Sequence, residues 1–189
     1  MSLTMEFLRH PRRTGAVAAS SPALARRLTD PLALHRARTI VELGPGTGTV
    51  TAAIRARMHP DARLVAVELN PALAQVVRER FAGPRIEVRT APAADLPELV
   101  DGPVDAVVSG LPWAAMRSAE RTRVLDAVTA VLRPDGALTT FAYVHAAWSP
   151  PARDFAADLS SRFADVRRSP VVWRNMPPAF VHHAAAPKP

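Results

Sequence analysis

Residues 41–49, with the sequence Val-Glu-Leu-Gly-Pro-Gly-Thr-Gly-Thr, connect an apolar run to a helix-like pattern through a turn that contains three glycines. The run at 39–43 predicts a buried parallel strand, and the pattern at 47–58 predicts the helix that follows it. Glycine lacks a Cβ atom, so this turn can adopt positive φ angles and let a ligand lie against the backbone. The stretch therefore predicts a strand–turn–helix unit with a ligand-binding turn.

A carboxylate ends the next predicted strand, at 63–68. Glu68 follows Gly48 by about twenty residues, the usual spacing in nucleoside-binding folds. Neighbouring strands of a doubly wound sheet bring such an acid beside the glycine turn, where it can accept hydrogen bonds from both ribose hydroxyls. A dinucleotide fingerprint that starts at Gly44 would need Gly or Ala at position 49, which is Thr49 here. The two segments therefore predict a site for a nucleoside-containing ligand other than a dinucleotide.

The pattern from Glu42 through Gly48 resembles motif I of the class I S-adenosylmethionine-dependent methyltransferases. The resemblance implies S-adenosylmethionine as cofactor, with Glu68 on its ribose. It also implies that Asp95, beyond the third strand, accepts a hydrogen bond from the adenine amine; a helix cap or turn is the alternative role for this residue. The expected cofactor-binding residues are Val17, Ser21, Glu42, Gly44, Gly46, Thr47, Gly48, Glu68, Leu69, Ala94, Asp95 and Ser109.

Predicted strands and helices alternate along the chain, which indicates an α/β fold with a parallel sheet and helices on both faces. The resemblance implies a Rossmann-like, mostly parallel seven-stranded sheet that closes with a C-terminal antiparallel hairpin. The expected strands are 39–43, 63–68, 85–90, 103–109 and 136–144, with closing apolar segments at 164–173 and 178–186. The expected helices are 20–35, interrupted near Pro31, then 47–58, 71–82, 118–132 and 151–163.

Length and composition restrict the organisation and the chemistry. The 189 residues suit one compact domain, in which residues 1–35 are expected to form a helical lid over the cofactor and residues 36–189 the binding domain. Cysteine is absent, which excludes disulfides, thiol nucleophiles and cysteine metal sites and favours a cytoplasmic protein. The histidines lack metal-ligand spacing, so no metal is expected. No apolar run of about twenty residues occurs.

The segment Ser109-Gly-Leu-Pro-Trp113 ends the fourth predicted strand and resembles motif IV of enzymes that methylate amines. Methyl transfer from a sulfonium is an in-line displacement, so the protein mainly aligns and desolvates the amine. The resemblance implies Ser109, Leu111 and Tyr143 as catalytic residues and Trp113, Tyr143 and His145 as substrate contacts. The alternative is a surface turn whose tryptophan only packs.

Segments 7–21, 109–113 and 173–181 together resemble the bacterial phospholipid N-methyltransferases, distant relatives of the rRNA adenine dimethylases. The resemblance implies a phosphatidylethanolamine-type amine as acceptor, a lid at 15–21 over the methionine end of the cofactor, and an aromatic rim for a methylated ammonium, in which Trp148 would join the substrate contacts. The opening residues would either lie on an anionic membrane, as a peripheral contact at its inner surface, or cap the acceptor pocket.

Three other functions remain open from the sequence. A soluble metabolite could be the acceptor. Adenine N6-methylation of RNA agrees with the net charge of +7, but Ser109 replaces the usual Asn or Asp and no basic domain is appended, so a nucleic-acid partner is disfavoured. The third alternative is a non-catalytic binding module. The scattered arginines fit either a phosphate-binding face or a bias of composition, and the oligomeric state stays open.

Overall fold

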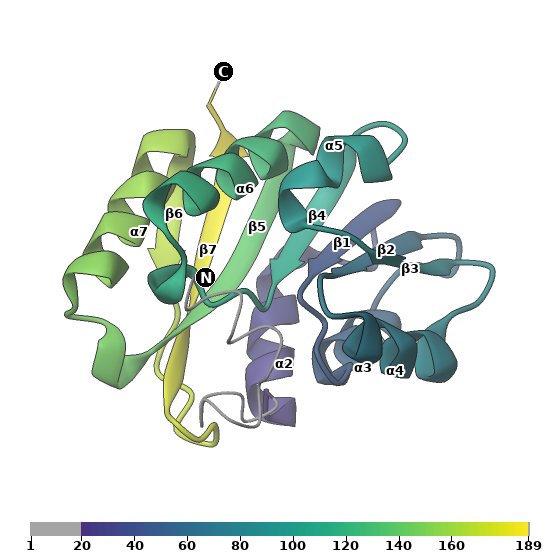
Figure 1. Ribbon diagram of the computed structural model, residues 1–189, viewed down its shortest axis with the longest axis horizontal. Coiled ribbons are helices and arrows are strands. Elements are labelled where there is room, and N and C mark those ends of the chain that lie inside the picture. The colour runs from purple at the N-terminus through teal and green to yellow at the C-terminus, as the bar shows by residue number, and fades with distance from the viewer. Residues whose placement is uncertain (1–19, 189) are drawn as a thin grey trace.

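The computed structural model describes residues 20–188, which form a single seven-stranded sheet with helices on both faces (Figure 1). The strands are β1 (Thr39–Leu43), β2 (Arg63–Glu68), β3 (Ile86–Thr90), β4 (Val104–Ser109), β5 (Leu132–Tyr143), β6 (Phe163–Arg168) and β7 (Ala179–Pro187). Their order is β3-β2-β1-β4-β5-β7-β6. Strands β1 to β5 are parallel, and β7 is antiparallel to both of its neighbours. The predicted fold class is confirmed.

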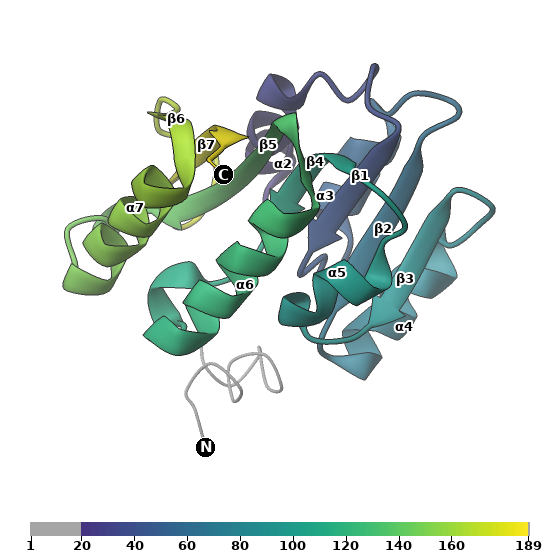
Figure 2. The same ribbon diagram turned by 90° about the horizontal axis from the view of Figure 1, so that it is seen from above.

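Helices alternate with the strands and divide between the two faces of the sheet. They are α2 (Pro22–Thr29), α3 (Thr49–Arg55), α4 (Pro71–Phe81), α5 (Leu96–Leu99), α6 (Ser118–Val131) and α7 (Pro150–Arg162). Helices α2 to α4 lie below the sheet in Figure 1 and α5 and α6 above it. Viewed from above, α6 runs roughly along the strands, α5 lies beside it, and α7 lies at the left near β6 and β7 (Figure 2).

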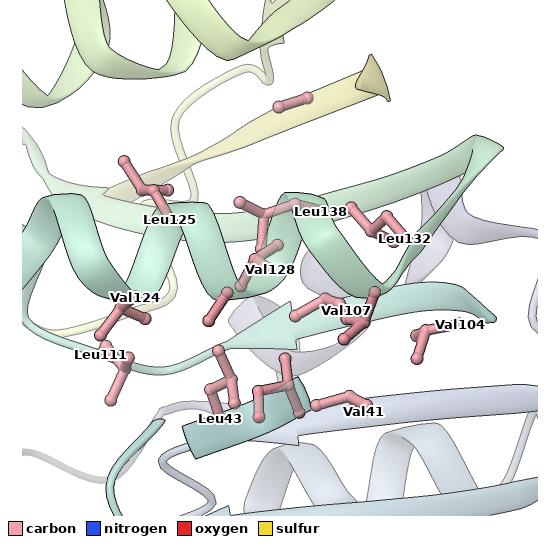
Figure 3. Close-up of a cluster of buried hydrophobic side chains, with 14 of the residues drawn as sticks. Val41, Leu43, Val104, Val107, Leu111, Val124, Leu125, Val128, Leu132 and Leu138 are labelled. Atoms are coloured by element: carbon pink, nitrogen blue, oxygen red, sulfur yellow. The ribbon is translucent and has the colours of Figure 1, made fainter. Parts of the chain in front are cut away.

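The core is built from alternating strand residues. On β1, Val41 and Leu43 pack with α6 residues such as Leu125, whereas Ile40 packs on the opposite face with Leu24 and Leu28 of α2. Figure 3 shows the first of these clusters between β1, β4, β5 and α6. Successive strand residues point to opposite faces, so a sheet covered by helices on both sides buries nearly continuous apolar runs. Helix α2 thus shares the core of the strands.

Several boundaries differ from the sequence prediction for local reasons. Helix α3 begins at Thr49 and not at 47, because Gly48 has a φ of 87° and ends the turn. Strand β5 begins at Leu132, four residues early, because Leu132 pairs with Val104 before a register irregularity. Strand β6 stops at Arg168, and beyond it Val172 forms only an isolated bridge. The short helix α5 was not predicted.

The register of the sheet aligns the residues that matter for function. Leu43 pairs with Ser109, and Ser109 pairs with Thr140. Thr140 pairs with His182 of β7, which pairs with Arg168 of β6. Residues paired in this way project from the same face of neighbouring strands. The row runs along the carboxyl edge of β1, β4 and β5, where open α/β sheets bind their ligands.

Candidate active site

The glycine turn after β1 is held against the end of β2. Gly44, Gly46 and Gly48 have φ angles of 70°, 57° and 87°, which side chains other than glycine rarely adopt. The N–H of Gly46 donates to one carboxylate oxygen of Glu68 at 3.1 Å, and the N–H of Asn70 donates to the other at 2.9 Å. A carboxylate has about four acceptor positions, so Glu68 keeps capacity for ribose hydroxyls.

The turn after β4 lies against the glycine turn. Gly110 donates its N–H to the carbonyl oxygen of Leu43 at 2.7 Å. A Cβ atom on Gly110 would lie 2.6 Å from the carbonyl oxygen of Gly44, so glycine is required for this close approach. The two turns therefore form one continuous wall, which joins the expected cofactor motif to the expected acceptor motif.

A cavity of about 530 Å³ opens along this wall at the carboxyl ends of β1, β4 and β5. Strands β6 and β7 close its far end. The polar and charged side chains that line it are those of Ser20, Glu42, Thr47, Thr49, Trp113, Tyr143, Ser149, Arg168 and His182. Most of the remaining lining is apolar, so the cavity suits a ligand whose apolar part is removed from water.

Aromatic side chains form the middle of the cavity. Trp113 is only 2% exposed, stacks on Phe155 of α7 with ring centres 5.0 Å apart, and donates its indole N–H to the hydroxyl of Thr140 at 2.8 Å. Phe180 packs edge-on against His182 at 5.1 Å. These contacts fix the ring of Trp113 as a wall of the cavity, with its polar atom satisfied.

Glu42 lies at the glycine end of the cavity and is almost completely buried, with 1% exposure. Neither carboxylate oxygen has a hydrogen-bond partner within residues 20–188. Burial raises its pKa from 4.5 to about 8. The nearby hydroxyl and backbone N–H of Thr51 oppose this rise, and the negative charge of Glu68 adds to it. An enclosed carboxyl without a partner suits a cationic ligand group, because such a group would stabilise the ionised form.

The residues expected to bind the cofactor divide into two sets. Glu42, Gly44, Gly46 and Thr47 line the cavity, together with Leu111, Trp113 and Tyr143 from the acceptor set. The other described cofactor residues, Gly48, Glu68, Leu69, Ala94, Asp95, Ser109 and Ser21, do not line it, nor does His145 of the acceptor set. Burial raises the pKa of Glu68, and hydrogen bonds from the backbone N–H groups of Asn70, Gly46 and Leu69 act in the opposite direction. Val17 lies outside the described residues.

Several predicted residues have structural partners that affect their expected roles. The hydroxyl of Ser109 is buried and accepts the N–H of Leu111 at 3.2 Å, so it shapes the turn that carries the acceptor motif. The hydroxyl of Ser21 caps α2 by accepting the N–H of Leu24. Asp95 ends a 3₁₀ turn at Ala93–Asp95, without a side-chain cap. Direct ligand contacts by these residues stay predictions.

The expected aromatic rim is only partly assembled. Tyr143 lines the cavity, and burial raises its pKa, so its hydroxyl is neutral at physiological pH. The ring of His145 stacks on Tyr143 at 5.7 Å and so supports this side chain from outside the cavity. Trp148 is 84% exposed and is absent from the lining, so its expected place in the rim is wrong for this conformation.

Sequence reasoning missed the part of the cavity that comes from the C-terminal strands. Phe155, Phe180, His182 and Arg168 all line it. Phe155, His182 and Arg168 lie outside the motifs named above, and Phe180 lies in segment 173–181, for which no ligand contact was expected. The pairing of β7 with β5 brings His182 to the acceptor side, and the pairing of β6 with β7 brings Arg168 beside it; the residues that pair across strands have no local signature in the sequence. Alternation along β7 places Phe180 and His182 on one face and could have suggested that the two act together.

The asparagine of the closing segment holds the start of α2. The N–H of Ser21 donates to the side-chain oxygen of Asn175 at 2.9 Å, and the Asn175 amide donates to the carbonyl of Pro177 at 2.7 Å. Asn175 is buried. The hydrogen bonds attach the entry of α2, and Ser20 in the cavity lining beside it, to the loop before β7.

Two negative findings apply to residues 20–188. No helix in this part of the chain has the length and apolar character needed to cross a membrane. The same residues contain no group of three or more histidine, aspartate or glutamate side chains placed to hold a metal ion.

Comparison with known proteins gives related sequences and folds. A family model described as a methyltransferase domain matches residues 40–136. The chain is similar to the ornithine lipid N-methyltransferase of Singulisphaera acidiphila, with 31% identity over 179 residues that cover 92% of this chain and 89% of that protein. A shorter similarity, 39% identity over 74 residues, relates it to ribosomal RNA small subunit methyltransferase A of Acidobacterium capsulatum and covers 39% of this chain and 25% of that protein.

Solved structures share the fold. The crystal structure of the O-methyltransferase TomG from Streptomyces achromogenes, in complex with SAM, matches with a TM-score of 0.67 and 20% identity. The match covers 98% of this chain and 91% of that chain. At this level of identity the likeness concerns the fold and carries no information about the acceptor.

Proposed function

The chain belongs to the class I S-adenosylmethionine-dependent methyltransferases, and on this premise we propose that it methylates the amine of a lipid headgroup. The proposal rests mainly on one observation: an aromatic cavity, about 530 Å³ in volume, continues directly from the glycine turn. The similarity to an ornithine lipid N-methyltransferase over nearly the whole chain supports the same acceptor class.

The residues of the glycine turn fit the cofactor. When bound, S-adenosylmethionine supplies an electrophilic methyl group on a sulfonium centre. Gly46 has a positive φ, and a Cβ atom added to it would meet nothing within 4 Å, so a ligand can lie against its backbone. Glu42, buried and unpaired within residues 20–188, is proposed to face the methionine ammonium, and Glu68 the ribose. Asp95 is proposed to bind the adenine amine.

The acceptor side of the cavity favours a neutral amine. Only a neutral nitrogen has the lone pair that attacks the methyl group, and transfer to an apolar site lowers the pKa of an ammonium ion. Trp113, held by Thr140 and Phe155, and Tyr143 bound this side. Their proposed role is to orient the nitrogen in line with the bond that breaks and to exclude water. The turn at 109–113, shaped by the hydrogen bond from the Leu111 N–H to the Ser109 hydroxyl, is proposed to set the distance of Trp113 from the cofactor.

We also propose that residues 15–21, within the N-terminal segment 1–35, cover the methionine end of the cofactor and that the opening residues can contact a membrane surface, whereas α2 packs in the core. Ser20 lines the cavity, and Ser21 is tied to Asn175, so the chain enters α2 at the proposed methionine end. Bound S-adenosylhomocysteine should slow tryptic cleavage after Arg9, Arg12 and Arg13, measured by mass spectrometry. Cleavage there that proceeds at the same rate with and without the ligand would contradict the lid.

The acceptor can be tested by methyl transfer from labelled S-adenosylmethionine. One set of assays offers vesicles that contain phosphatidylethanolamine or ornithine lipid; a second offers free ethanolamine or ornithine; a third offers ribosomal RNA. Glu68→Ala, which is expected to bind the cofactor more weakly, serves as the control for cofactor-dependent transfer. We expect label in the lipid fraction only. Label confined to the soluble amines or to RNA would refute the lipid acceptor and leave the methyltransferase assignment intact.

A further inference from the structure

The end of the cavity farthest from the glycine turn has a positive charge. Arg168, the last residue of β6, lines the cavity beside Phe180 and His182 of β7. Its guanidinium carbon lies 5.2 Å from the centre of the Phe180 ring. Within residues 20–188 no carboxylate forms an ion pair with Arg168, whereas the adjacent Arg167 is paired with Asp165 at 2.8 Å. Arg168 therefore keeps its charge available to a ligand.

Arg168 is aligned with the acceptor turn through the strand register. It pairs with His182, which pairs in turn with Thr140. Thr140 pairs with Ser109 and accepts the indole N–H of Trp113. Ser109 and Arg168 are thus three strand spacings apart, about 14 Å between their backbones. The long arginine side chain reaches back over Phe180 and shortens this distance, so a small headgroup can span the space between the two ends.

His182 lies between the two ends of this row and carries no charge at physiological pH. It is 3% exposed, and its Nδ1 atom has no hydrogen-bond partner within residues 20–188. Burial, together with the weaker influence of the Arg168 charge, lowers its pKa from 6.5 to about 4. A neutral imidazole does not repel an amine in the cavity. The only positive charge among the described lining residues is consequently that of Arg168.

We propose that Arg168 binds the anionic group of a zwitterionic acceptor, an oxyanion a few bonds from the amine, and so places the amine at the turn formed by residues 109–113. A guanidinium binds carboxylate or phosphate oxygens through paired N–H donors, which fixes orientation as well as charge. The inference rests on the proposed amine acceptor and narrows it: zwitterionic headgroups are preferred over amines that carry only a positive charge.

Two amphiphiles that cannot be methylated measure how much the anionic group contributes to binding. Dodecylphosphocholine and dodecyltrimethylammonium share the alkyl chain and the quaternary ammonium, and only the first carries a phosphate. We would titrate each calorimetrically, below its micelle concentration, into protein saturated with S-adenosylhomocysteine. The proteins are wild type, Arg168→Gln, Arg168→Lys and the matched control Arg167→Gln, which removes the same charge from the neighbouring position on β6.

Arg168→Gln should weaken dodecylphosphocholine binding about tenfold or more, since a hydrogen bond to a charged group is lost. Dodecyltrimethylammonium should bind at least as tightly as to wild type, since the substitution removes a positive charge near its ammonium. Arg168→Lys should retain part of the phosphate-dependent affinity. Arg167→Gln should bind both amphiphiles like wild type. An equal loss for both amphiphiles in Arg168→Gln, or no loss for either, would overturn the proposal. S-adenosylhomocysteine binding reports whether each variant is folded.

A further arm distinguishes a headgroup from a free anion. Inorganic phosphate should compete with dodecylphosphocholine only weakly, because it lacks the ammonium and the alkyl chain. Phosphate that binds as tightly as the amphiphile would instead identify a site for the free ion and refute a headgroup subsite. No step of the test measures methyl transfer. Arg168-dependent binding by a protein that methylates no lipid amine would therefore refute the proposed function alone.

Discussion

Replacing Glu42 by glutamine should stabilise the cofactor-free fold at neutral pH and weaken cofactor binding. The carboxyl is enclosed at the glycine end of the cavity without a hydrogen-bond partner within residues 20–188. Burial is the main reason that its pKa rises from 4.5 to about 8. Glutamine has nearly the same shape as the protonated side chain and carries no charge in either the folded or the unfolded state.

The size of the effect follows from the two pKa values. The unfolded chain ionises Glu42 above about pH 4.5, whereas the folded protein keeps it protonated up to about pH 8. The contribution of this group to stability is therefore complete below pH 4.5 and is lost as the pH rises toward 8. The loss is about 1.4 kcal/mol per pH unit, or about 3 kcal/mol at pH 7. Glu42→Gln should recover this amount.

Urea unfolding followed by circular dichroism, from pH 4.5 to 8.5 without cofactor, measures the difference. The free energies of unfolding of Glu42→Gln and wild type should nearly coincide at pH 4.5, separate by about 3 kcal/mol at pH 7 and stop diverging above pH 8. Glu98→Gln, on the exposed surface of α5, is the matched control and should show no such divergence. A difference for Glu42→Gln that is independent of pH would refute the reasoning.

The same substitution should reveal a proton linked to cofactor binding. If Glu42 faces the methionine ammonium, it must ionise when the ligand binds, so wild type should release about one proton at pH 7. Titration with S-adenosylhomocysteine in buffers of different ionisation enthalpy measures this number. Glu42→Gln should bind more weakly and release no proton. Equal proton release by both proteins would assign the linkage to another group.

Three further substitutions test the geometry of the site. Gly110→Ala should destabilise the fold by about 1–3 kcal/mol in thermal unfolding and weaken cofactor binding, because its Cβ would lie 2.6 Å from the Gly44 carbonyl oxygen. Thr140→Val should cost about 1–3 kcal/mol, since it leaves the buried indole N–H of Trp113 unpaired, and should raise KM for the acceptor more than KM for the cofactor. Glu68→Ala should lower S-adenosylhomocysteine affinity about tenfold or more in calorimetric titration.

A matched control variant, or an outcome that would contradict the prediction, can be stated for each of these substitutions. Gly83→Ala adds a Cβ with nothing within 4 Å and should be nearly neutral, so equal losses at Gly83 and Gly110 would contradict the close approach. Thr129→Val changes a partly buried threonine on α6, away from the cavity, and should leave acceptor kinetics unchanged. Cofactor binding by Glu68→Ala at wild-type affinity would remove Glu68 from the site.

The sequence alone determined the fold and placed the glycine turn beside Glu68, whereas the ligand contacts of the expected cofactor residues stay predictions. The apolar runs at 39–43 and 63–68 predict their strands to the residue, because a parallel sheet covered on both faces needs continuous apolar strands. The glycines from Gly44 to Gly48 and the acid Glu68 belong to a local unit in which the turn and its neighbour need particular residue types. Because these residue types occur at fixed spacings in a short motif, they can be identified without a structure.

On the acceptor side the sequence predicted Leu111, Trp113 and Tyr143, and only the tertiary structure revealed the end of the cavity farthest from the glycine turn. Phe155, His182 and Arg168 lie outside the motif segments identified in the sequence, and Phe180 lies in one without an expected role. The antiparallel insertion of β7 between β5 and β6 brings these residues to one end of the cavity. Tertiary packing also decided that Trp148 points to solvent. Alternation within a strand shows which residues share a face, but it does not show which distant strand becomes the neighbour or which side chains that neighbour covers. The physical basis of acceptor recognition therefore lies in the pairing of strands and not in any one stretch of the chain.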